Sequence, residues 1–352
     1  MTNDTMQRCL LVGIGGALLD ELSELVRAAG GMEGGRLVQN RRTPDPATYV
    51  GEGKLAEIRQ MAEENECTAI VCDDELTPSQ LNQMSKALDL EVLDRTLVIL
   101  DIFAARAITR EGKIQVELAQ LKYRQAHLVG STTYLSRQGG GIGTRGPGET
   151  RLETNRRQIG HRIATLSREL EKVKSHREVT RRQRTKRGIT TCAIVGYTNA
   201  GKSTLLNLLT GSSVLSEDAL FATLDPTTRR LYLPGGRTIL LTDTVGLVRK
   251  LPHDLVDAFR ATLEEAALSD ILIHVVDAAS PDMEQEMATV YQVLDDLSAG
   301  HKKVITLLNK ADLPGARDFV VDHRALQVLP FSAKTGDGKQ ALLAALEKAL
   351  EE

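Results

Sequence analysis

The sequence of 352 residues contains no tryptophan, and aromatic residues make up only 3% of it. A surface that stacks the bases of single-stranded nucleic acid on exposed rings needs several aromatic side chains close together, so such a platform is not expected. Cysteine is also scarce, and Cys9, Cys67, Cys72 and Cys192 form no C-x2-C pair and lack histidines at ligand spacing. This distribution argues against zinc and disulfides and favours a reducing compartment.

Long hydrophobic runs are absent as well. No stretch resembles a secretory signal or an apolar segment of about 18 residues. We therefore expect a cytoplasmic protein without a membrane span. A hydrophobic content of 41% in a chain of this length is typical of a soluble protein with two or three domains.

Positive charge is unevenly distributed along the chain, although the formal net charge is −3. Between Arg151 and Arg187 there are 13 lysines and arginines against 4 aspartates and glutamates. Such a basic block indicates a polyanionic partner, and a solvated helix face is the ordinary alternative.

The segment Gly196–Thr204 (GYTNAGKST) fits the phosphate-binding pattern G-x4-G-K-[ST]. Residues 191–195 before it read as a buried strand and residues 205–209 after it open a helix. The backbone N–H groups of the loop therefore converge at a helix N-terminus, where an anion binds. We expect Lys202 to reach the outer phosphates and the Ser203 hydroxyl to be a ligand of Mg²⁺.

Two further segments complete the predicted magnesium and γ-phosphate site. Phe221–Thr228 has few secondary-structure signals and should order over the γ-phosphate, with Thr223 as the Mg²⁺ ligand and Thr227 or Thr228 as alternatives. A strand over 238–241 then leads to Asp243-Thr244-Val245-Gly246. We expect Asp243 to hold Mg²⁺ through water and the Gly246 N–H to sense the γ-phosphate, so the metal set is Ser203, Thr223 and Asp243.

Later strand ends are expected to select the base. A strand over 271–276, with His274 packed in the core, is followed by one over 304–308 that leads to Asn309-Lys310-Ala311-Asp312. The Asp312 carboxylate can accept hydrogen bonds from N1–H and the N2 amine of guanine, which adenine does not offer, so GTP is the predicted substrate. Lys310 would pack along the base plane, Asn309 would tether neighbouring loops, and the Ala333 N–H would face guanine O6.

The complete prediction for the nucleotide site follows from these motifs. Catalytic roles are assigned to Lys202, Asn199, Thr223 and Gly246. The residues expected to bind GTP or GDP are Gly196, Tyr197, Thr198, Asn199, Ala200, Gly201, Lys202, Ser203, Thr204, Phe221, Thr223, Asp243, Gly246, Asn309, Lys310, Asp312, Ser332, Ala333 and Lys334.

One position departs from the pattern of Ras-like GTPases. There, a glutamine directly after the glycine of D-x2-G orients the attacking water, whereas this sequence has Leu247. An aliphatic side chain cannot orient water, so hydrolysis is expected to use another group. It is expected to be slow until a partner orders Phe221–Thr228 and Asp243–Gly246, the two switch segments. The Asn199 amide could hold a monovalent cation, K⁺, in the place of an arginine finger, or it could be a hydrogen-bonding loop residue.

The N-terminal region alternates short apolar segments with helical patterns, which predicts a small α/β domain. The expected strands are 10–12, 37–38, 69–72 and 92–93, and the expected helices are 17–29, 52–64 and 78–88. The spacing of Gly51–Lys54 (GEGK) is wrong for a phosphate loop, and a glycine-rich helix entry explains it.

The middle region is predicted to form a helical hairpin. Apolar residues recur at heptad-like spacing from Ile114 to Leu128 and from Leu152 to Val173, so two helices should pair antiparallel. The loop Arg137–Arg151 has six glycines, which would let its backbone approach RNA closely while its arginines add charge; a flexible tip without a ligand is the alternative. The basic residues left for solvent or a ligand are Arg156, Arg157, Arg162, Arg168, Lys172 and Lys174.

The fold expected from these parts is α/β throughout. A small N-terminal α/β domain would occupy residues 1–108. The antiparallel helical hairpin, its glycine-rich loop and a basic linker would occupy 109–187, and a P-loop GTPase domain with a mostly parallel sheet would occupy 188–352.

These motifs extend over nearly the whole chain and resemble the HflX GTPases, which are ribosome-associated members of the TRAFAC class. The stretches that carry the resemblance, besides Gly196–Thr204, are Tyr49–Lys54 (YVGEGK), Asp94–Thr96 (DRT), Gln115–Leu121 (QVELAQL), Gly139–Glu149 (GGGIGTRGPGE), Phe221–Thr228 (FATLDPTT) and Leu251–Leu255 (LPHDL). The family often carries a small C-terminal domain after the nucleotide domain, whereas this sequence ends at Glu352.

The resemblance implies an N-terminal domain that approaches the peptidyl transferase region of 23S rRNA in the 50S subunit. It also implies a GTPase stimulated by that subunit, with a role in splitting or rescuing stalled 70S ribosomes under stress. A hydrophobic residue after D-x2-G is normal for this group, and the resemblance supports K⁺ at Asn199.

Three functional hypotheses follow, and in each the protein is expected to be a monomer. The leading one is a GTP-driven switch whose basic hairpin enters ribosomal RNA. The second is an RNA-binding assembly or silencing factor in which GTP turnover is incidental. The third, a dual ATP/GTP enzyme with remodelling activity in its N-terminal domain, rests on Gly51–Lys54 alone.

Overall fold

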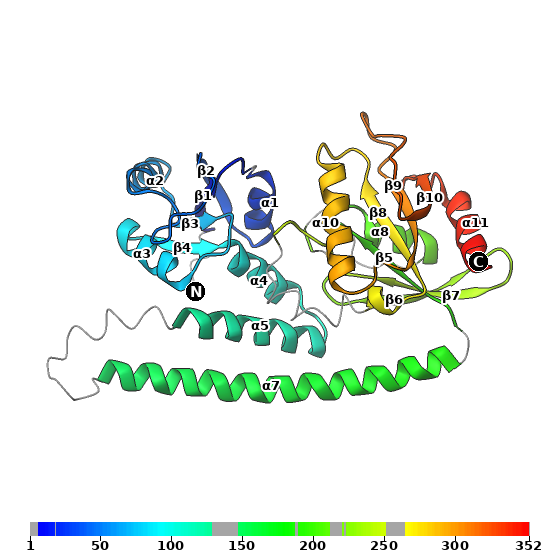
Figure 1. The fold of residues 1–352 in the computed structure, drawn as a ribbon, viewed down its shortest axis with the longest axis horizontal. Coiled ribbons are helices and arrows are strands. Elements are labelled where there is room, and N and C mark those ends of the chain that lie inside the picture. Colours follow the sequence, from blue (N-terminus) through cyan, green and yellow to red (C-terminus); the bar gives the residue numbers. More distant parts are fainter. Residues whose placement is uncertain are drawn as a thin grey trace. The chain divides into compact units, whose positions relative to one another are not determined.

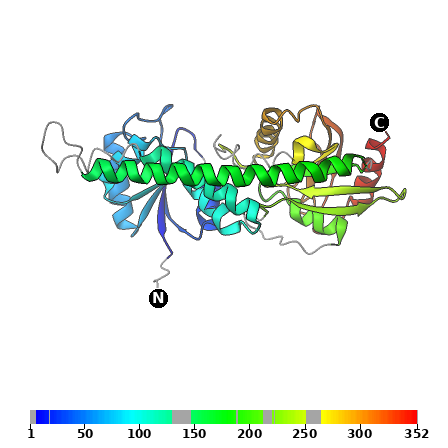
Figure 2. The ribbon, with the colours of Figure 1, turned by 90° about the horizontal axis from the view of Figure 1, so that it is seen from below.

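A computed structural model of the protein describes residues 6–17, 19–128, 147–186, 189–211, 220–221, 223–250 and 265–351 (Figures 1 and 2). They form two compact units. The first comprises Met1–Ala105 and Lys113–Glu171, and the second comprises Arg106–Gly112 and Lys172–Glu352. In the parts of the chain that the structure describes, no helix is both long and apolar enough to cross a bilayer.

The first unit contains a four-stranded parallel sheet in the order β2-β1-β3-β4. Its strands are β1 (Arg8–Ile14), β2 (Met32–Gln39), β3 (Ala69–Cys72) and β4 (Glu91–Asp94), and its helices are α1 (Asp20–Ala28), α2 (Glu52–Glu64), α3 (Pro78–Leu88) and α4 (Arg95–Arg106). Helices α2 and α3 lie on one side of the sheet, with α1 and α4 on the other (Figure 1). The predicted small α/β domain is confirmed, but α4 was not anticipated. Seven of its residues are buried, so its sequence lacks the polar face that marks a surface helix.

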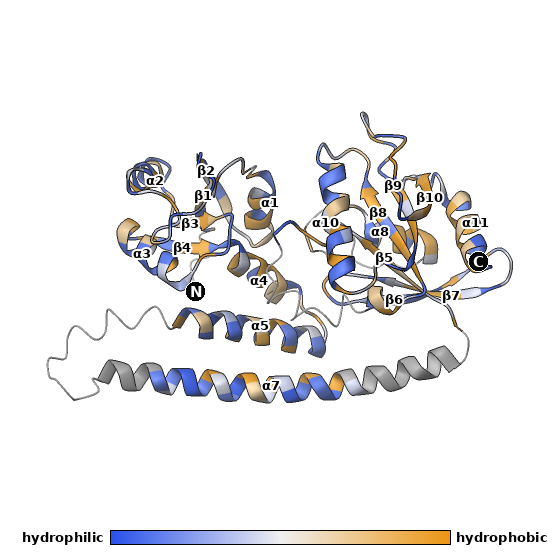
Figure 3. Ribbon diagram, viewed as in Figure 1, coloured by the Kyte–Doolittle hydropathy of each residue, from blue (hydrophilic) through white to orange (hydrophobic). Residues whose placement is uncertain are grey.

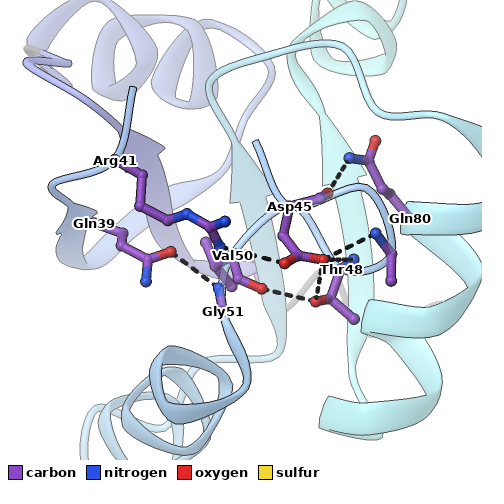
Figure 4. A network of polar contacts seen from close by, with 8 residues as sticks. Gln39, Arg41, Asp45, Thr48, Val50, Gly51 and Gln80 are labelled. Carbon is purple, nitrogen blue, oxygen red and sulfur yellow. Dashed lines mark hydrogen bonds and ion pairs between the residues drawn. The ribbon is translucent and has the colours of Figure 1, made fainter. Parts of the chain in front are cut away.

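The segment between β2 and α2 is held by a network of polar contacts (Figure 4). The Gln80 side-chain amide donates to the Asp45 carbonyl oxygen at 2.6 Å, and the Gly51 N–H donates to Gln39 Oε1 at 3.0 Å. Tyr49 has a φ of 64° and is 1% exposed, and its hydroxyl donates to Asp74. Gly51 is the N-cap of α2 in extended conformation, which agrees with the helix entry expected from the glycine spacing.

The antiparallel helical hairpin is confirmed within the first unit. It is formed by α5 (Arg110–Leu128) and the N-terminal part of α7 (Pro147–Lys186). Its hydrophobic seam contains the buried residues Ile114, Leu118, Leu166 and Leu170, with Leu121 and Ile163 packed against them. The hydropathy colours of α7 show apolar positions interrupting a mainly hydrophilic helix (Figure 3), as expected for a helix that packs along a narrow stripe.

Two expectations for this region need amendment. Arg162 was predicted to remain for solvent or a ligand, but its guanidinium donates to both carboxylate oxygens of Glu117 at 2.7 and 2.9 Å, because the antiparallel register brings them together. Helix α7 also continues through most of the expected basic linker to Lys186. Residues 137–146 of the glycine-rich loop lie outside the described residues, and its end, 147–151, belongs to α7.

The second unit contains a six-stranded sheet in the order β10-β9-β8-β5-β7-β6, which is parallel except for the β6–β7 pair. The strands are β5 (Thr191–Gly196), β6 (Thr227–Tyr232), β7 (Thr238–Asp243), β8 (Ile271–Asp277), β9 (Lys303–Asn309) and β10 (Ala325–Pro330). Helices α8 (Lys202–Thr210) and α11 (Lys339–Ala349) share one buried cluster with the sheet, and α10 (Met283–Asp296) contributes to another. The predicted mostly parallel GTPase sheet is confirmed.

His274 lies in the middle of β8 and is 1% exposed, with its ring edge-on to Tyr291 at a centroid distance of 5.0 Å. Burial lowers the pKa of His274 to about 4, against the opposing effect of Asp322. In the unfolded chain, the pKa of this histidine is about 6.5. Between pH 6.5 and 4 the unfolded state therefore binds more protons than the folded state. Acidification through this window should therefore destabilise the protein, by about 3 kcal/mol from this group.

The measurement is the free energy of unfolding by urea at pH 7 and pH 4.5. His274→Leu, which removes the titrating ring at similar volume, is expected to show a smaller loss of stability between these values than the unsubstituted protein. An equal loss in both would show that protonation of His274 does not contribute.

Candidate nucleotide site

The phosphate-binding loop connects β5 to α8, as its sequence predicts. Gly196 has a φ of 157°, and a side chain there would collide with the Val275 carbonyl oxygen of the adjacent strand. Gly201 has a φ of 98°, and a side chain there would collide with the Asn309 amide. Both positions therefore need glycine, since a Cβ has no room and positive φ is costly for other residues. Asn199 has a φ of 60° and is exposed on the loop.

Lys202 begins α8 and is 6% exposed, with its Nζ donating to the Tyr197 carbonyl oxygen at 2.6 Å. Burial lowers the pKa of Lys202 to about 8, and Asp243 opposes this shift. The ammonium group is thus held by the carbonyl of its own loop. A phosphate would provide the counter-charge that the buried ammonium group needs.

The three residues predicted to hold magnesium lie together. The Ser203 hydroxyl donates to Asp243 Oδ2 at 2.7 Å and lies 2.7 Å from Thr223 Oγ1. Asp243 is fully buried, and burial raises its pKa against the opposing effects of Lys202, Ser203 and Thr223. Within the described residues, its Oδ1 atom has no hydrogen-bond partner. Hard oxygen donors around an unpaired buried carboxylate oxygen fit a Mg²⁺ ion, which would neutralise this charge.

The alternative threonines of the switch segment lie elsewhere. Thr227 and Thr228 belong to β6, and Thr228 Oγ1 is 2.9 Å from Thr242 Oγ1 of the paired strand β7. This pairing keeps the Thr228 hydroxyl on the sheet. The geometry therefore favours Thr223 as the magnesium ligand of this segment.

The segment after β7 is joined to the phosphate loop. The Thr198 N–H donates to the Leu247 carbonyl oxygen at 2.8 Å, and the Leu247 N–H donates to the Gly196 carbonyl oxygen at 3.2 Å. A Cβ on Gly246 would lie 2.8 Å from Thr198 Cγ2, so only glycine fits there. The Leu247 side chain is 3% exposed, which agrees with the expectation that it does not orient the attacking water.

The two loops predicted to recognise the base are joined by hydrogen bonds. Ser332 Oγ donates to Asp312 Oδ1 at 2.7 Å, and the Ala311 N–H donates to the Phe331 carbonyl oxygen at 3.0 Å. Asn309 is 2% exposed, and its amide donates to the Ala200 carbonyl oxygen of the phosphate loop at 2.7 Å. Asn309 thus tethers neighbouring loops, as its position after β9 suggested.

Ala333 and Lys310 have contacts that the sequence did not indicate. The Ala333 N–H, expected to face guanine O6, donates to Asn309 Oδ1 at 2.8 Å in this structure. Lys310 has a φ of 62°, and its Nζ is 2.7 Å from Asp277 Oδ2 at the end of β8. The signal for Asp277 was its place at the end of a strand beside β9, because parallel strands end at the same edge of the sheet.

Comparison with known proteins identifies the family of this chain. Family models match three consecutive segments: a GTP-binding GTPase N-terminal region over 17–104, a GTP-binding GTPase middle region over 106–184 and a 50S ribosome-binding GTPase over 191–310. The chain is 57% identical over 336 residues to GTPase HflX of Lacrimispora saccharolytica, covering 94% of this chain and 78% of that protein. The chain belongs to the HflX family of GTPases.

Other HflX relatives and solved structures agree with this assignment. GTPase HflX of Escherichia coli K12 is 43% identical, covering 94% of this chain and 79% of the relative. The structure of SsGBP with GDP is 26% identical, covers 97% of this chain and 98% of that one, and has a TM-score of 0.54. A GTP-binding protein from Sulfolobus solfataricus with GDP is 25% identical, with 98% of both chains covered and a TM-score of 0.50. As an HflX-family GTPase, the protein hydrolyses GTP.

Proposed function

We propose that this HflX-family GTPase is a molecular switch that binds the 50S ribosomal subunit and dissociates or rescues stalled 70S ribosomes under stress. The observation that carries the proposal is that both switch segments contact the phosphate loop and its helix. The Thr223 hydroxyl lies beside that of Ser203 at the proposed metal position, and the Leu247 backbone is hydrogen-bonded to the phosphate loop. A γ-phosphate bound in the loop would lie beside both segments, which makes them able to report GTP. The match to a 50S ribosome-binding GTPase model supports the 50S subunit as the partner.

The chemistry assigned to the site follows from the residues that converge there. Ser203 and Asp243, with Thr223 in the GTP state, would hold Mg²⁺, which supplies charge neutralisation of the phosphate oxygens when bound. Lys202 would bind the outer phosphates, and the Gly246 N–H would bind the γ-phosphate. Asp312 would accept hydrogen bonds from guanine, with Lys310 along the base plane and Ser332, Ala333 and Lys334 completing the pocket.

The proposed RNA surface consists of exposed basic side chains of α7. Arg156, Arg168 and Lys172 are exposed there, and side chains of this type bind RNA phosphates. The ligand we propose is 23S rRNA near the peptidyl transferase region, which the N-terminal domain would approach. The helical hairpin of residues 109–187 would enter ribosomal RNA beside it. We further propose that the protein acts as a cytoplasmic monomer and that Asn199, exposed on the phosphate loop, holds K⁺ during hydrolysis.

The test is GTP turnover with and without purified 50S subunits, in potassium and then in sodium buffer. Turnover is expected to be slow alone and to rise at least about tenfold with 50S but not with 30S subunits, because a partner must order the switch segments. Loss of basal turnover in sodium is the result expected if Asn199 holds K⁺. Absence of a 50S response would instead favour the RNA-binding assembly or silencing factor.

The RNA surface has its own test with matched charge changes. The double variant Arg156→Glu, Arg168→Glu on α7 should bind 50S more weakly and with a shallower salt dependence, since each lost phosphate contact removes counterion release. The control is Lys86→Glu with Lys348→Glu, two exposed lysines on α3 and α11. Equal loss of binding in both double variants would contradict a specific role for α7.

A further inference from the structure

The residue two positions after Thr223 is bound to a distant part of the sequence. Asp225 Oδ2 accepts hydrogen bonds from the Ile108 N–H at 3.0 Å and the Thr109 N–H at 2.9 Å, and its Oδ1 accepts from the Thr109 hydroxyl. Both donor residues lie in the connector between α4 and α5, residues 107–109, within the stretch Arg106–Gly112 that is part of the second unit. A carboxylate is thus satisfied by three donors that lie 116 or 117 residues earlier in the chain.

The connector and the first turn of α5 leave room for this carboxylate. A Cβ on Gly112 would collide with Asp225 Oδ1, so the absence of a side chain there makes room for it. Thr109 Oγ1 also accepts from the Gly112 N–H at 3.0 Å, and it thereby caps the first turn of α5. Thr109 therefore serves two partners, one in its own helix and one in the switch segment.

Asp225 is two residues away from Thr223, which lies beside Ser203 at the proposed metal position. Leu224, between Thr223 and Asp225, is 2% exposed and fixes the intervening backbone. Asp225 also precedes Pro226, which restricts it to extended conformations, and β6 begins at Thr227. Because two residues span at most about 7 Å, a fixed Asp225 limits how far the backbone of Thr223 can move away from Ser203.

We propose that Asp225 is a positioning residue for GTP hydrolysis. Its hydrogen bonds to the connector between α4 and α5 fix the position of Thr223, the expected magnesium ligand two residues earlier. The connector holds Thr223 where it meets the metal and the γ-phosphate. In return, release of the switch segment frees the first turn of α5, which continues into the helical hairpin. The inference rests on the GTPase cycle itself and extends the proposed ribosomal switch by naming the contact between the switch segment and the connector.

The first experiment measures intrinsic GTP turnover without ribosomal subunits, so that its outcome does not depend on ribosome binding. Asp225→Asn keeps the size of the side chain but removes its charge and replaces one of its two accepting oxygens by an NH₂ group. We expect kcat to fall about tenfold with KM and GDP affinity within about twofold, because only the state with an ordered Thr223 is affected. Thr109→Val, which loses the hydroxyl, should also lower kcat, and Thr109→Ser should restore it.

A second measurement detects the coupling directly and remains informative if turnover is slow. Ile108 is 75% exposed and the four native cysteines are buried, so Ile108→Cys can be labelled selectively with a fluorophore. The emission should differ between GDP and a non-hydrolysable GTP analogue, and Asp225→Asn should abolish this difference. The control label is at Leu326→Cys, which is 51% exposed on β10. Unchanged kcat in a folded Asp225→Asn protein, or a nucleotide response of the label that survives the substitution, would overturn the proposal.

Discussion

Replacing Asp312 by asparagine is expected to lower the affinity for GTP about 10⁴-fold and to create binding of xanthosine triphosphate. The Asp312 carboxylate accepts from Ser332 Oγ, and the pKa of Asp312 is lowered by this hydrogen bond and by Lys334 and Lys310. The group is therefore an anion at neutral pH, suited to the two N–H donors of guanine. An asparagine amide would place a donor against the guanine amine, whereas xanthine has a carbonyl oxygen at that position.

Nucleotide affinity is measured by competition with a fluorescent GDP. The matched control is Asp337→Asn, an exposed carboxylate that accepts from Thr335 beside the same loop, which should change GTP affinity by less than about twofold. An Asp312→Asn variant that still binds GTP as tightly as the original protein would show that another group reads the base.

Lys202→Ala is expected to have the second large effect, lowering GTP turnover by about 10²- to 10³-fold. Lys202 is the buried cation of the phosphate loop, and its Nζ lies 2.6 Å from the Tyr197 carbonyl oxygen, which a phosphate oxygen would replace. Without the Lys202 ammonium group, no positive charge of the loop stabilises the negative charge that develops on the phosphate oxygens. Asp243 also loses a neighbouring cation.

Single-turnover hydrolysis at saturating GTP measures this effect. Lys339→Ala is the control, because Lys339 Nζ also donates to a backbone carbonyl, that of Leu208 at 3.0 Å, but lies on α11. It should reduce stability without reducing turnover. Lys202→Ala also separates the functional hypotheses: a GTP-driven switch loses ribosome dissociation, whereas a passive RNA-binding factor keeps its effect on ribosomes.

The local geometry of the phosphate loop could be predicted from the sequence. Strand, glycine loop, Lys202, Ser203 and helix follow one another between Thr191 and Thr210, and such short-range patterns depend mainly on backbone geometry. The order of Asp243, Asn309 and Asp312 at strand ends was also predictable, because parallel strands connected by helices bring their carboxyl ends to one edge. The pairing of α5 and α7 was predicted by the heptad spacing of their apolar residues, because helical periodicity alone identifies the buried stripe of a helix.

The helix α4 and the pairing of individual side chains were not predictable. Helix α4 is buried on more than one side, so it shows no clear amphipathic period, and the pair Arg162–Glu117 depends on the register of two helices. Likewise, the Ala333 N–H is bound to Asn309 rather than open, which depends on how closely two loops approach each other.

The sequence by itself determined that this chain is an α/β P-loop GTPase with a helical hairpin, because its motifs and periodicities are local and each has few structural solutions. Only the tertiary structure decided which distant groups meet. The contacts of Asp225 with the connector and of Leu247 with the phosphate loop join segments about 50 to 117 residues apart. Contacts over such separations are set by the packing of whole elements against each other, and no spacing along the chain encodes them.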